Sequence, residues 1–207
     1  MEYPQKILTV DKFTEFTYKE KSSVFTGQVY HCESENEASQ ILEPVKKKYF
    51  DATHHCFAYK LINGHFKYSD DGEPNGTAGI RILNAIEHFK LVNVIVVIIR
   101  YYGGTKLGVG PLGKAYYTSA YTVLDKAEKL EKALLQKVII EADLNYSGHI
   151  HRILAKFNSV IDKQEFKDNA IFQCFVRPSD LSKITLQLTN ISKGNIKLLA
   201  TKIYTYK

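Results

Sequence analysis

The residues best suited to chemistry in this chain lie in a glycine-rich segment that also carries basic side chains, residues 100–114. It reads Arg-Tyr-Tyr-Gly-Gly-Thr-Lys-Leu-Gly-Val-Gly-Pro-Leu-Gly-Lys and holds five of the 12 glycines of the protein. Glycine lets a ligand or another chain approach the backbone closely. The N–H groups of such a loop, and the positive end of a helix that follows it, attract anions. The sequence therefore predicts an anion or phosphate site formed by Arg100, Gly103, Gly104, Lys106, Gly108, Gly110 and Lys114.

A second segment, residues 69–79, places three carboxylates within four positions. Asp70, Asp71 and Glu73 are residues that could bind a divalent cation or supply an acid/base pair. Asp-Gly and Pro-Asn-Gly, which also occur here, are equally typical of turns. No second group of ligands supports a metal site, so we expect no metal. We expect the three carboxylates to order the glycine loop by pairing with its basic side chains.

His54, His55 and Cys56 follow one another on an expected strand, where adjacent side chains point to opposite faces. The three residues therefore do not form a metal site or a nucleophile with its base. We expect one of the histidines to face the loop, and we assign His54, with Thr77, to a supporting role. The sequence favours a binding protein over an enzyme, although Asp70 or Asp71 with a histidine remains an alternative acid/base site.

Two nucleotide-binding signatures resemble part of the glycine segment. Residues 108–113 match G-x-G-x-x-G, but eight residues separate Ile99 from Gly108, whereas that fingerprint directly follows its strand. A Walker loop is also a poor match, because Ala115 occupies the position of the hydroxyl that holds Mg²⁺ and Pro111 lacks a backbone donor. We therefore expect no cofactor.

Hydrophobic patterning indicates which elements position these segments. Residues 92–99 are nearly all β-branched and apolar, which is typical of a strand buried on both faces. Ser34 and Glu37 have capping-box spacing at the start of a helix that we expect to bend or end near Pro44. Asn75 or Thr77 is expected to cap a later helix. Strands are expected at 22–32, 54–61, 66–69 and 92–99, with one helix from about residue 34 through Val45 and others at 77–89 and 111–127.

The rest of the chain predicts a second domain with the order β-α-β-β-α-β, which is that of a ferredoxin-like fold. Its expected elements are a strand at 134–144, a helix at 147–157, strands at 160–166 and 170–177, a helix at 179–191 and a strand at 196–206. Residues 125–132 contain no Pro or Gly and are expected to be a short helical extension. The predicted fold class is therefore α+β, with domains at 1–128 and 129–207.

The composition limits the classes of function. Residues 126–207 hold 14 Lys and Arg against 8 Asp and Glu, so the net charge of +6 lies entirely in this part. Such asymmetry favours a polyanionic partner such as RNA or the ribosome, and a solvated lysine-rich surface is the alternative. No apolar run is long enough to span a membrane, and residues 1–11 lack the order of a secretory signal. The three widely spaced cysteines favour the reducing cytoplasm.

Several motifs resemble the YigZ/IMPACT family. They are Asp-Asp-Gly-Glu-Pro-x-Gly-Thr-Ala-Gly at 70–79, Arg-Tyr-Tyr-Gly-Gly-x-Lys-Leu-Gly at 100–108, Asp-Ala-Thr-His at 51–54 followed by Cys56, and Lys-Ser-x-x-Phe at 21–25. The resemblance covers about residues 15–127. It implies an N-terminal α+β domain similar to a ribosomal-protein and elongation-factor-G fold, followed by a ferredoxin-like domain.

The resemblance also implies a function. Eukaryotic members of the family regulate translation by blocking activation of a starvation-responsive kinase, and nucleic-acid or ribosome binding is the usual conjecture for bacterial members. This chain departs from the family pattern at Lys114, where the family has Arg. Lysine lacks the planar fork of arginine, which puts bidentate recognition at this position in doubt.

Together these observations predict a two-domain protein that binds a polyanion, RNA or a ribosomal surface, and acts in translation or its regulation. Two alternatives remain open. One is a hydrolase that uses Asp70, Asp71 and Glu73, and the other is a module that docks onto a protein partner in a stress-response kinase pathway.

Overall fold

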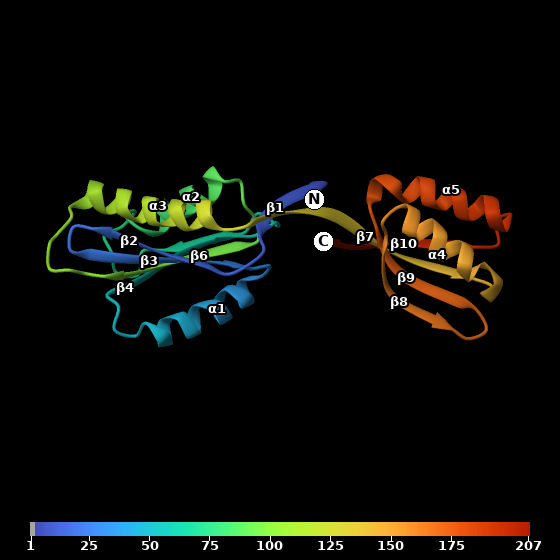
Figure 1. Ribbon diagram of the computed structural model, residues 1–207, viewed down its shortest axis with the longest axis horizontal. Helices are drawn as coiled ribbons and strands as arrows, with labels where there is room; N and C mark the ends of the chain where they lie inside the picture. The colour runs from blue at the N-terminus through green and yellow to red at the C-terminus, as the bar shows by residue number, and fades with distance from the viewer. Residues whose placement is uncertain (1–2) are drawn as a thin grey trace. The chain divides into compact units, whose positions relative to one another are not determined.

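The computed structural model describes residues 3–207, which divide into two compact units (Figure 1). The first unit is Leu8–Glu131. The second combines the N-terminal residues through Ile7 with Lys132–Lys207. Both units are mixed α+β with antiparallel sheets, which confirms the fold class expected from the sequence.

The first unit is built on a five-stranded sheet with the order β2-β3-β6-β4-β5. Its strands are β2 (Thr14–Glu20), β3 (Ser23–His31), β4 (His54–Lys60), β5 (Phe66–Ser69) and β6 (Val94–Tyr101). The apolar residues of β6 are buried, as predicted for a strand covered on both faces. An Asn-Gly turn joins β4 to β5, and Gly64 in this turn has φ 85°.

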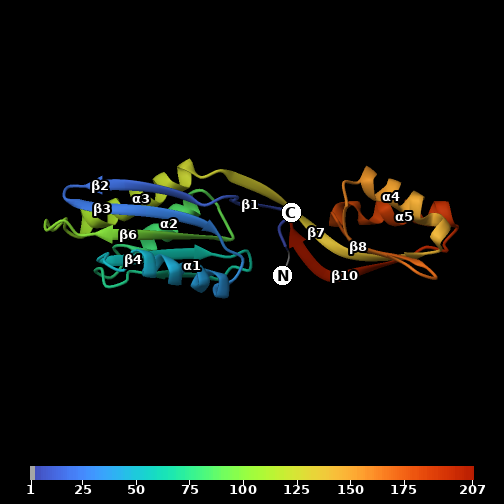
Figure 2. The same cartoon turned by 60° about the horizontal axis from the view of Figure 1, so that its bottom comes forward.

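Helices cover both faces of this sheet (Figures 1 and 2). Helices α2 (Gly79–His88) and α3 (Val109–Lys126) pack against one face, and α1 (Glu35–Lys48) packs against the other. Alternate residues of β4 and β6 enter the two cores: Cys56 and Ile98 face α2 and α3, whereas Phe57 and Ile99 belong to the core beside α1. The face on which a side chain of β4 lies therefore decides which helices it contacts.

The second unit has the predicted β-α-β-β-α-β order. Its elements are β7 (Lys129–Ala142), α4 (Ser147–Lys156), β8 (Val160–Phe166), β9 (Ala170–Val176), α5 (Leu181–Ser192) and β10 (Lys197–Tyr206). The strands pair in the order β10-β7-β9-β8, and all these pairs are antiparallel. Residues from α4 and α5 share one core with β7 and β9, so both helices cover the same face of the sheet (Figure 2).

Several expectations about local structure are wrong. Helix α1 continues through Pro44 to Lys48, because the ring removes only one hydrogen bond of the 14-residue helix. Helix α3 begins at Val109 and ends at Lys126, so Pro111 is its third residue and the segment before β7 is not a helical extension. Strands β1 (Lys6–Val10) and β2 were not predicted, and β2 alternates between half-buried and exposed positions.

Candidate functional site

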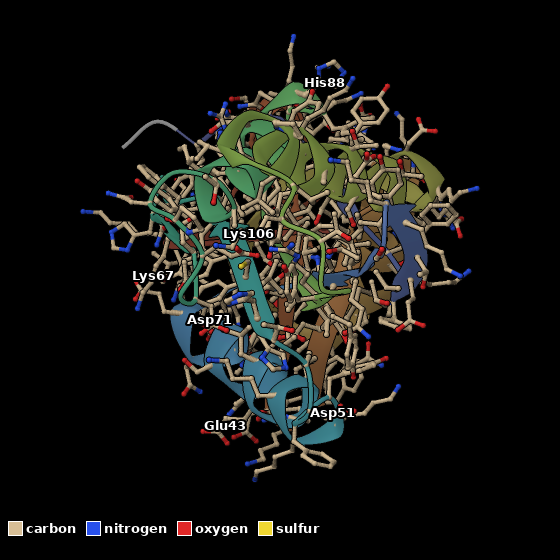
Figure 3. All side chains as sticks on the ribbon, turned by 90° about the vertical axis from the view of Figure 1, so that its left-hand side faces the viewer. Glu43, Asp51, Lys67, Asp71, His88 and Lys106 are labelled. Atoms are coloured by element: carbon tan, nitrogen blue, oxygen red, sulfur yellow. The ribbon has the colours of Figure 1, made fainter. Side chains whose placement is uncertain are left out.

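The candidate site lies at the end of the first sheet where β5 and β6 end and β4 begins. Helices α2 and α3 follow β5 and β6, so both begin near this end. Figure 3 views this end of the first unit and shows Lys106 near its middle. Within the sheet, Arg100 pairs in register with both Phe25 and His54, which places these side chains on the same face. The antiparallel register therefore brings the two sequence motifs together.

A cleft of about 440 Å³ opens at this end of the unit. The residues that line it come from the start of β4, the acidic segment, the end of β6 and the glycine loop through the first turn of α3: Thr53, His54, Glu73, Pro74, Arg100, Tyr102, Lys106, Leu107, Gly108, Val109 and Leu112. Five of the residues predicted for the site thus line one cleft: His54, Glu73, Arg100, Lys106 and Gly108.

Glu73 lies at the floor of the cleft, with only 4% of its side chain exposed. Its Oε1 atom accepts hydrogen bonds from Nη1 of Arg100 at 2.5 Å and from the hydroxyl of Tyr116 at 2.6 Å. Nε2 of His54 lies 3.7 Å from the same oxygen. These contacts explain how a carboxylate is buried here, because the charge of Glu73 is matched by a guanidinium and its oxygen accepts two hydrogen bonds.

Arg100 is buried rather than extended toward solvent. It is 5% exposed, and its Nη2 donates to Oγ of Ser23 at 3.2 Å. The guanidinium carbon lies 5.3 Å from the ring centroid of Phe25 and 5.5 Å from that of Tyr102. Among the described residues, its Nε has no hydrogen-bond partner. The pairing of Glu73 with a basic residue of the loop segment was expected, but it commits Arg100 to the floor of the cleft.

Asp70 and Asp71 have other partners. Oδ1 of Asp70 accepts from the N–H groups of Ala78 and Gly79, and its Oδ2 accepts from that of Gly76. Asp70 therefore caps α2, and the expectation that Asn75 or Thr77 would do so is wrong. The hydroxyl of Thr77 instead donates to the carbonyl of Pro74.

Asp71 connects the acidic segment to β4 and α1. Its Oδ2 accepts from the N–H of His55 at 2.6 Å, and its Oδ1 lies 3.8 Å from Nζ of Lys46. Both aspartates thus accept hydrogen bonds from backbone N–H groups rather than from the basic side chains of the glycine loop. In the part of the chain that the structure describes, no group of three His, Cys, Asp or Glu side chains is arranged to hold a metal ion.

The two histidines of β4 separate as their alternation predicts. His54 lines the cleft, and its Nδ1 lies 2.8 Å from the carbonyl oxygen of Asp71. His55 lies on the other face, where its Nε2 lies 2.9 Å from the carbonyl oxygen of Tyr49. The expectation that one histidine faces the loop is confirmed for His54.

The predicted glycines lie along the loop and the first turn of α3, whereas Lys114 lies outside the cleft. Gly103 lies against the backbone of Ser22, and Gly108, with φ 87°, precedes α3. Gly104 also has a positive φ, and Gly110 has open space around its Cα. Lys114 does not line the cleft: it borders a separate hollow of about 370 Å³ with Arg81, Asn84, Gly110, Gly113 and Tyr117.

Sequence reasoning missed Tyr116 and did not place Cys56. The Tyr116 hydroxyl donates to Glu73 and lies 3.3 Å from Sγ of Cys56. Burial raises the pKa of both the Tyr116 phenol and the Cys56 thiol well above their usual ranges. Both groups therefore stay protonated at neutral pH. A tyrosine on the buried face of a helix carries no signal in the sequence that distinguishes it from a core residue.

The described helices include none that combines the length and the apolar composition needed to cross a bilayer.

Comparisons with known proteins agree on one family. The model of the Impact N-terminal domain matches residues 21–124. The chain is 30% identical over 176 residues to IMPACT family member YvyE of Bacillus subtilis (strain 168), which covers 84% of this chain and 81% of that protein. It is 27% identical over 184 residues to IMPACT family member YigZ of Escherichia coli (strain K12), covering 87% and 90%.

A solved structure is similar to this chain over nearly its whole length. A crystal structure described as that of a hypothetical protein matches with a TM-score of 0.73 and 25% identity, covering 96% of this chain and 98% of the other. The similarity therefore extends well beyond the region that carries the sequence motifs.

Proposed function

Because this chain belongs to the IMPACT family, we propose that it binds RNA or a ribosomal surface in the cytoplasm and acts in translation or its regulation, with phosphate groups held at the cleft of the first unit. The proposal has two parts: the ligand, which is RNA or a ribosomal surface, and the process, which is translation or its regulation. Family membership supports the process, and the arrangement of charge in the cleft supports the ligand.

The observation that carries the proposal is the uncapped start of α3 beside Lys106. Helix α3 has 18 residues and its N-cap is Gly108, and no side chain of the described residues caps it. The N–H groups of Val109 and Gly110 precede the first helical bond, which Leu112 donates to Gly108. Helix α2 differs, because Asp70 already occupies its N-terminus. The start of α3 is therefore where an external anion fits.

Lys106 gives this position a positive charge. It is exposed, lines the cleft, and forms no ion pair with any residue of the described chain. Arg100 balances Glu73 by direct pairing, so Lys106 leaves the cleft with a net positive charge. In this arrangement Arg100 acts as the counter-ion of Glu73, and Lys106 acts as the phosphate contact.

Two further features extend the surface that a polyanion meets. Lys114 and Arg81 border the neighbouring hollow of the same unit, so they suit a second phosphate of the same strand. Tyr102 lines the cleft with 42% of its surface exposed, where an unpaired base could stack on it. The basic excess of residues 126–207 supports the same class of partner.

The proposal predicts that Lys106→Ala weakens RNA binding and reduces its salt dependence. Loss of one phosphate contact should lower the slope of log K against log salt by about one unit. The measurement is fluorescence anisotropy of a labelled single-stranded RNA between 50 and 300 mM KCl, concentrations chosen to span the range over which such contacts are screened, on the order of 0.1 M.

The matched control is Lys67→Ala, which removes an exposed lysine from β5 of the same unit without touching the cleft. It should retain the slope of the unmodified protein to within experimental error. Equal affinities and slopes for Lys106→Ala, Lys67→Ala and the unmodified protein would reject the cleft as the phosphate site.

A further inference from the structure

We propose that the floor of this cleft binds the 2′- and 3′-hydroxyls of a ribonucleotide whose phosphate is held at Lys106 and the start of α3. This inference rests on the proposed function, and it adds the class of ligand: a nucleotide unit with a free ribose diol, either as a free nucleotide or as the 3′ end of an RNA.

The first acceptor for the diol is Oε2 of Glu73. The hydrogen bonds and ion pairs of Glu73 with residues 3–207 are all made by Oε1, so Oε2 has no partner. Only 4% of the Glu73 side chain is exposed, and the residue lines the cleft. Oε2 is not one of the fully buried polar atoms of the described chain that lack a partner, so this oxygen is open to the cleft. A ligand hydroxyl in the cleft would supply a donor to it.

The second group for the diol is Nε2 of His54. The Nδ1 atom of this histidine lies 2.8 Å from a backbone carbonyl oxygen, which can only accept, so Nδ1 carries a proton. Nε2 lies 3.7 Å from Oε1 of Glu73, which places the imidazole beside the carboxylate. A hydroxyl can donate to Nε2 or accept from it, so a hydrogen bond to this nitrogen does not depend on the charge of the imidazole. A carboxylate and an imidazole side by side match the two adjacent hydroxyls of a ribose diol.

The charges at the floor favour hydroxyls over an ammonium group. Glu73 is already paired with Arg100 at 2.5 Å, and Lys106 adds a further positive charge to the cleft. A cationic ligand would therefore meet a site with a net positive charge. A ligand with neutral hydrogen-bond donors and an anionic group can place the donors at the floor of the cleft and the anion beside Lys106. A nucleotide has this combination, since its ribose donates hydrogen bonds and its phosphate carries the negative charge.

The size and walls of the cleft suit the same ligand. Its volume of about 440 Å³ falls within the range of small-molecule pockets. Leu107, Val109 and Leu112 form apolar walls, and Tyr102 offers an exposed ring on which a base can stack. The cleft thus provides separate surfaces for the ribose, the phosphate and the base.

Isothermal titration of the full-length protein with adenosine 5′-monophosphate, its 2′-deoxy form and its 3′-deoxy form tests the inference. We expect each missing hydroxyl to weaken binding by about tenfold, because one hydrogen bond to the floor of the cleft is lost. His54→Ala should remove most of the preference for the diol, whereas Lys106→Ala should weaken the ribo and deoxy forms by the same factor. His65→Ala, which removes an exposed histidine of the same unit, is the control and should leave all three affinities unchanged.

A second arm separates the two sources of the diol and the two proposals. A 12-nucleotide RNA with a free 3′ diol is compared with the same RNA carrying a 3′-phosphate. Weaker binding of the blocked RNA supports recognition of an RNA end. Binding of the nucleotide with no effect of the block assigns the site to free nucleotides. Equal affinities for ribo and deoxy nucleotides, or no nucleotide binding, overturn this inference, while salt-dependent RNA binding that requires Lys106 would leave the proposed function intact.

Discussion

At the scale of single residues, the chemistry of the cleft depends on one buried ion pair. The guanidinium of Arg100 and the carboxylate of Glu73 are both removed from water, and each is the main partner of the other. Tyr116 adds a hydrogen bond to the same carboxylate oxygen. Removing one member of such a pair leaves an uncompensated charge in the interior, which costs more than the pair contributes.

Arg100→Ala should therefore lower the free energy of unfolding by about 3–5 kcal/mol, since it leaves the carboxylate of Glu73 buried and unpaired. Urea unfolding followed by circular dichroism measures the change. Arg81→Ala is the control, because Arg81 is exposed on α2 and should change stability by less than about 0.5 kcal/mol. An Arg100→Ala protein as stable as this control would contradict the assignment.

At the scale of elements, the two helices that begin at the cleft differ in what occupies their N-termini. Asp70 accepts three backbone N–H groups and closes the start of α2. Among residues 3–207 no such side chain closes the start of α3, and a glycine loop that packs closely against Ser22, just before β3, leads to it. The same fold thus supplies its own anion at one helix and leaves the other available to a ligand.

Substitution by alanine should have different effects on the stability of the protein at Gly103 and at Gly110. A Cβ at Gly103 would lie 1.8 Å from the backbone oxygen of Ser22, whereas a Cβ at Gly110 would meet no atom within 4 Å. Gly103→Ala should therefore destabilise the protein by about 1–3 kcal/mol. Gly110→Ala, within the first turn of α3, should be neutral or stabilise it by up to about 1 kcal/mol.

Thermal unfolding of the two alanine variants beside the unmodified protein compares them directly. Equal melting temperatures for Gly103→Ala and Gly110→Ala would show that the loop does not require close contact with Ser22.

At the scale of the whole molecule, both units bury groups that resist ionisation. Burial raises the pKa of Cys32 to about 11 and that of Tyr30 to about 12 in the first unit. It raises the pKa of Cys174 to about 12 in the second unit. In the unfolded chain these groups lose their protons at lower pH, from about 9 for the thiols.

The free energy of unfolding should therefore fall as the pH rises from about 9 toward 12. Over this window the folded protein binds more protons than the unfolded chain, and the sign of the linkage then gives a loss of stability with rising pH. Urea titrations at pH 8, 9, 10 and 11, spaced on the order of one unit to resolve a single titration, measure the slope. The Cys32→Ala/Cys174→Ala protein should show a smaller fall, and an identical pH profile for both proteins would contradict this account.

The sequence alone determined the order of most elements, because hydrophobic period, turn residues and β-branched runs are local signals. Residues 94–99 of β6 form a continuous apolar run and are all buried, and β9 of the second unit alternates between buried and half-buried positions, so both strands can be recognised along the chain. The local pattern was weaker for β2, a half-exposed strand at the edge of its sheet, and it was not predicted.

Only the tertiary structure decided which of the chemically able residues share a site. Strand register places Arg100 beside His54, and helix packing brings Tyr116 to Glu73 across 43 positions of sequence. The same packing buries Arg100 and leaves Lys106 exposed, although both are basic residues of one segment. Burial and pairing arise from contacts between distant parts of the chain, so the types and spacing of residues name the candidates without saying which of them face a ligand.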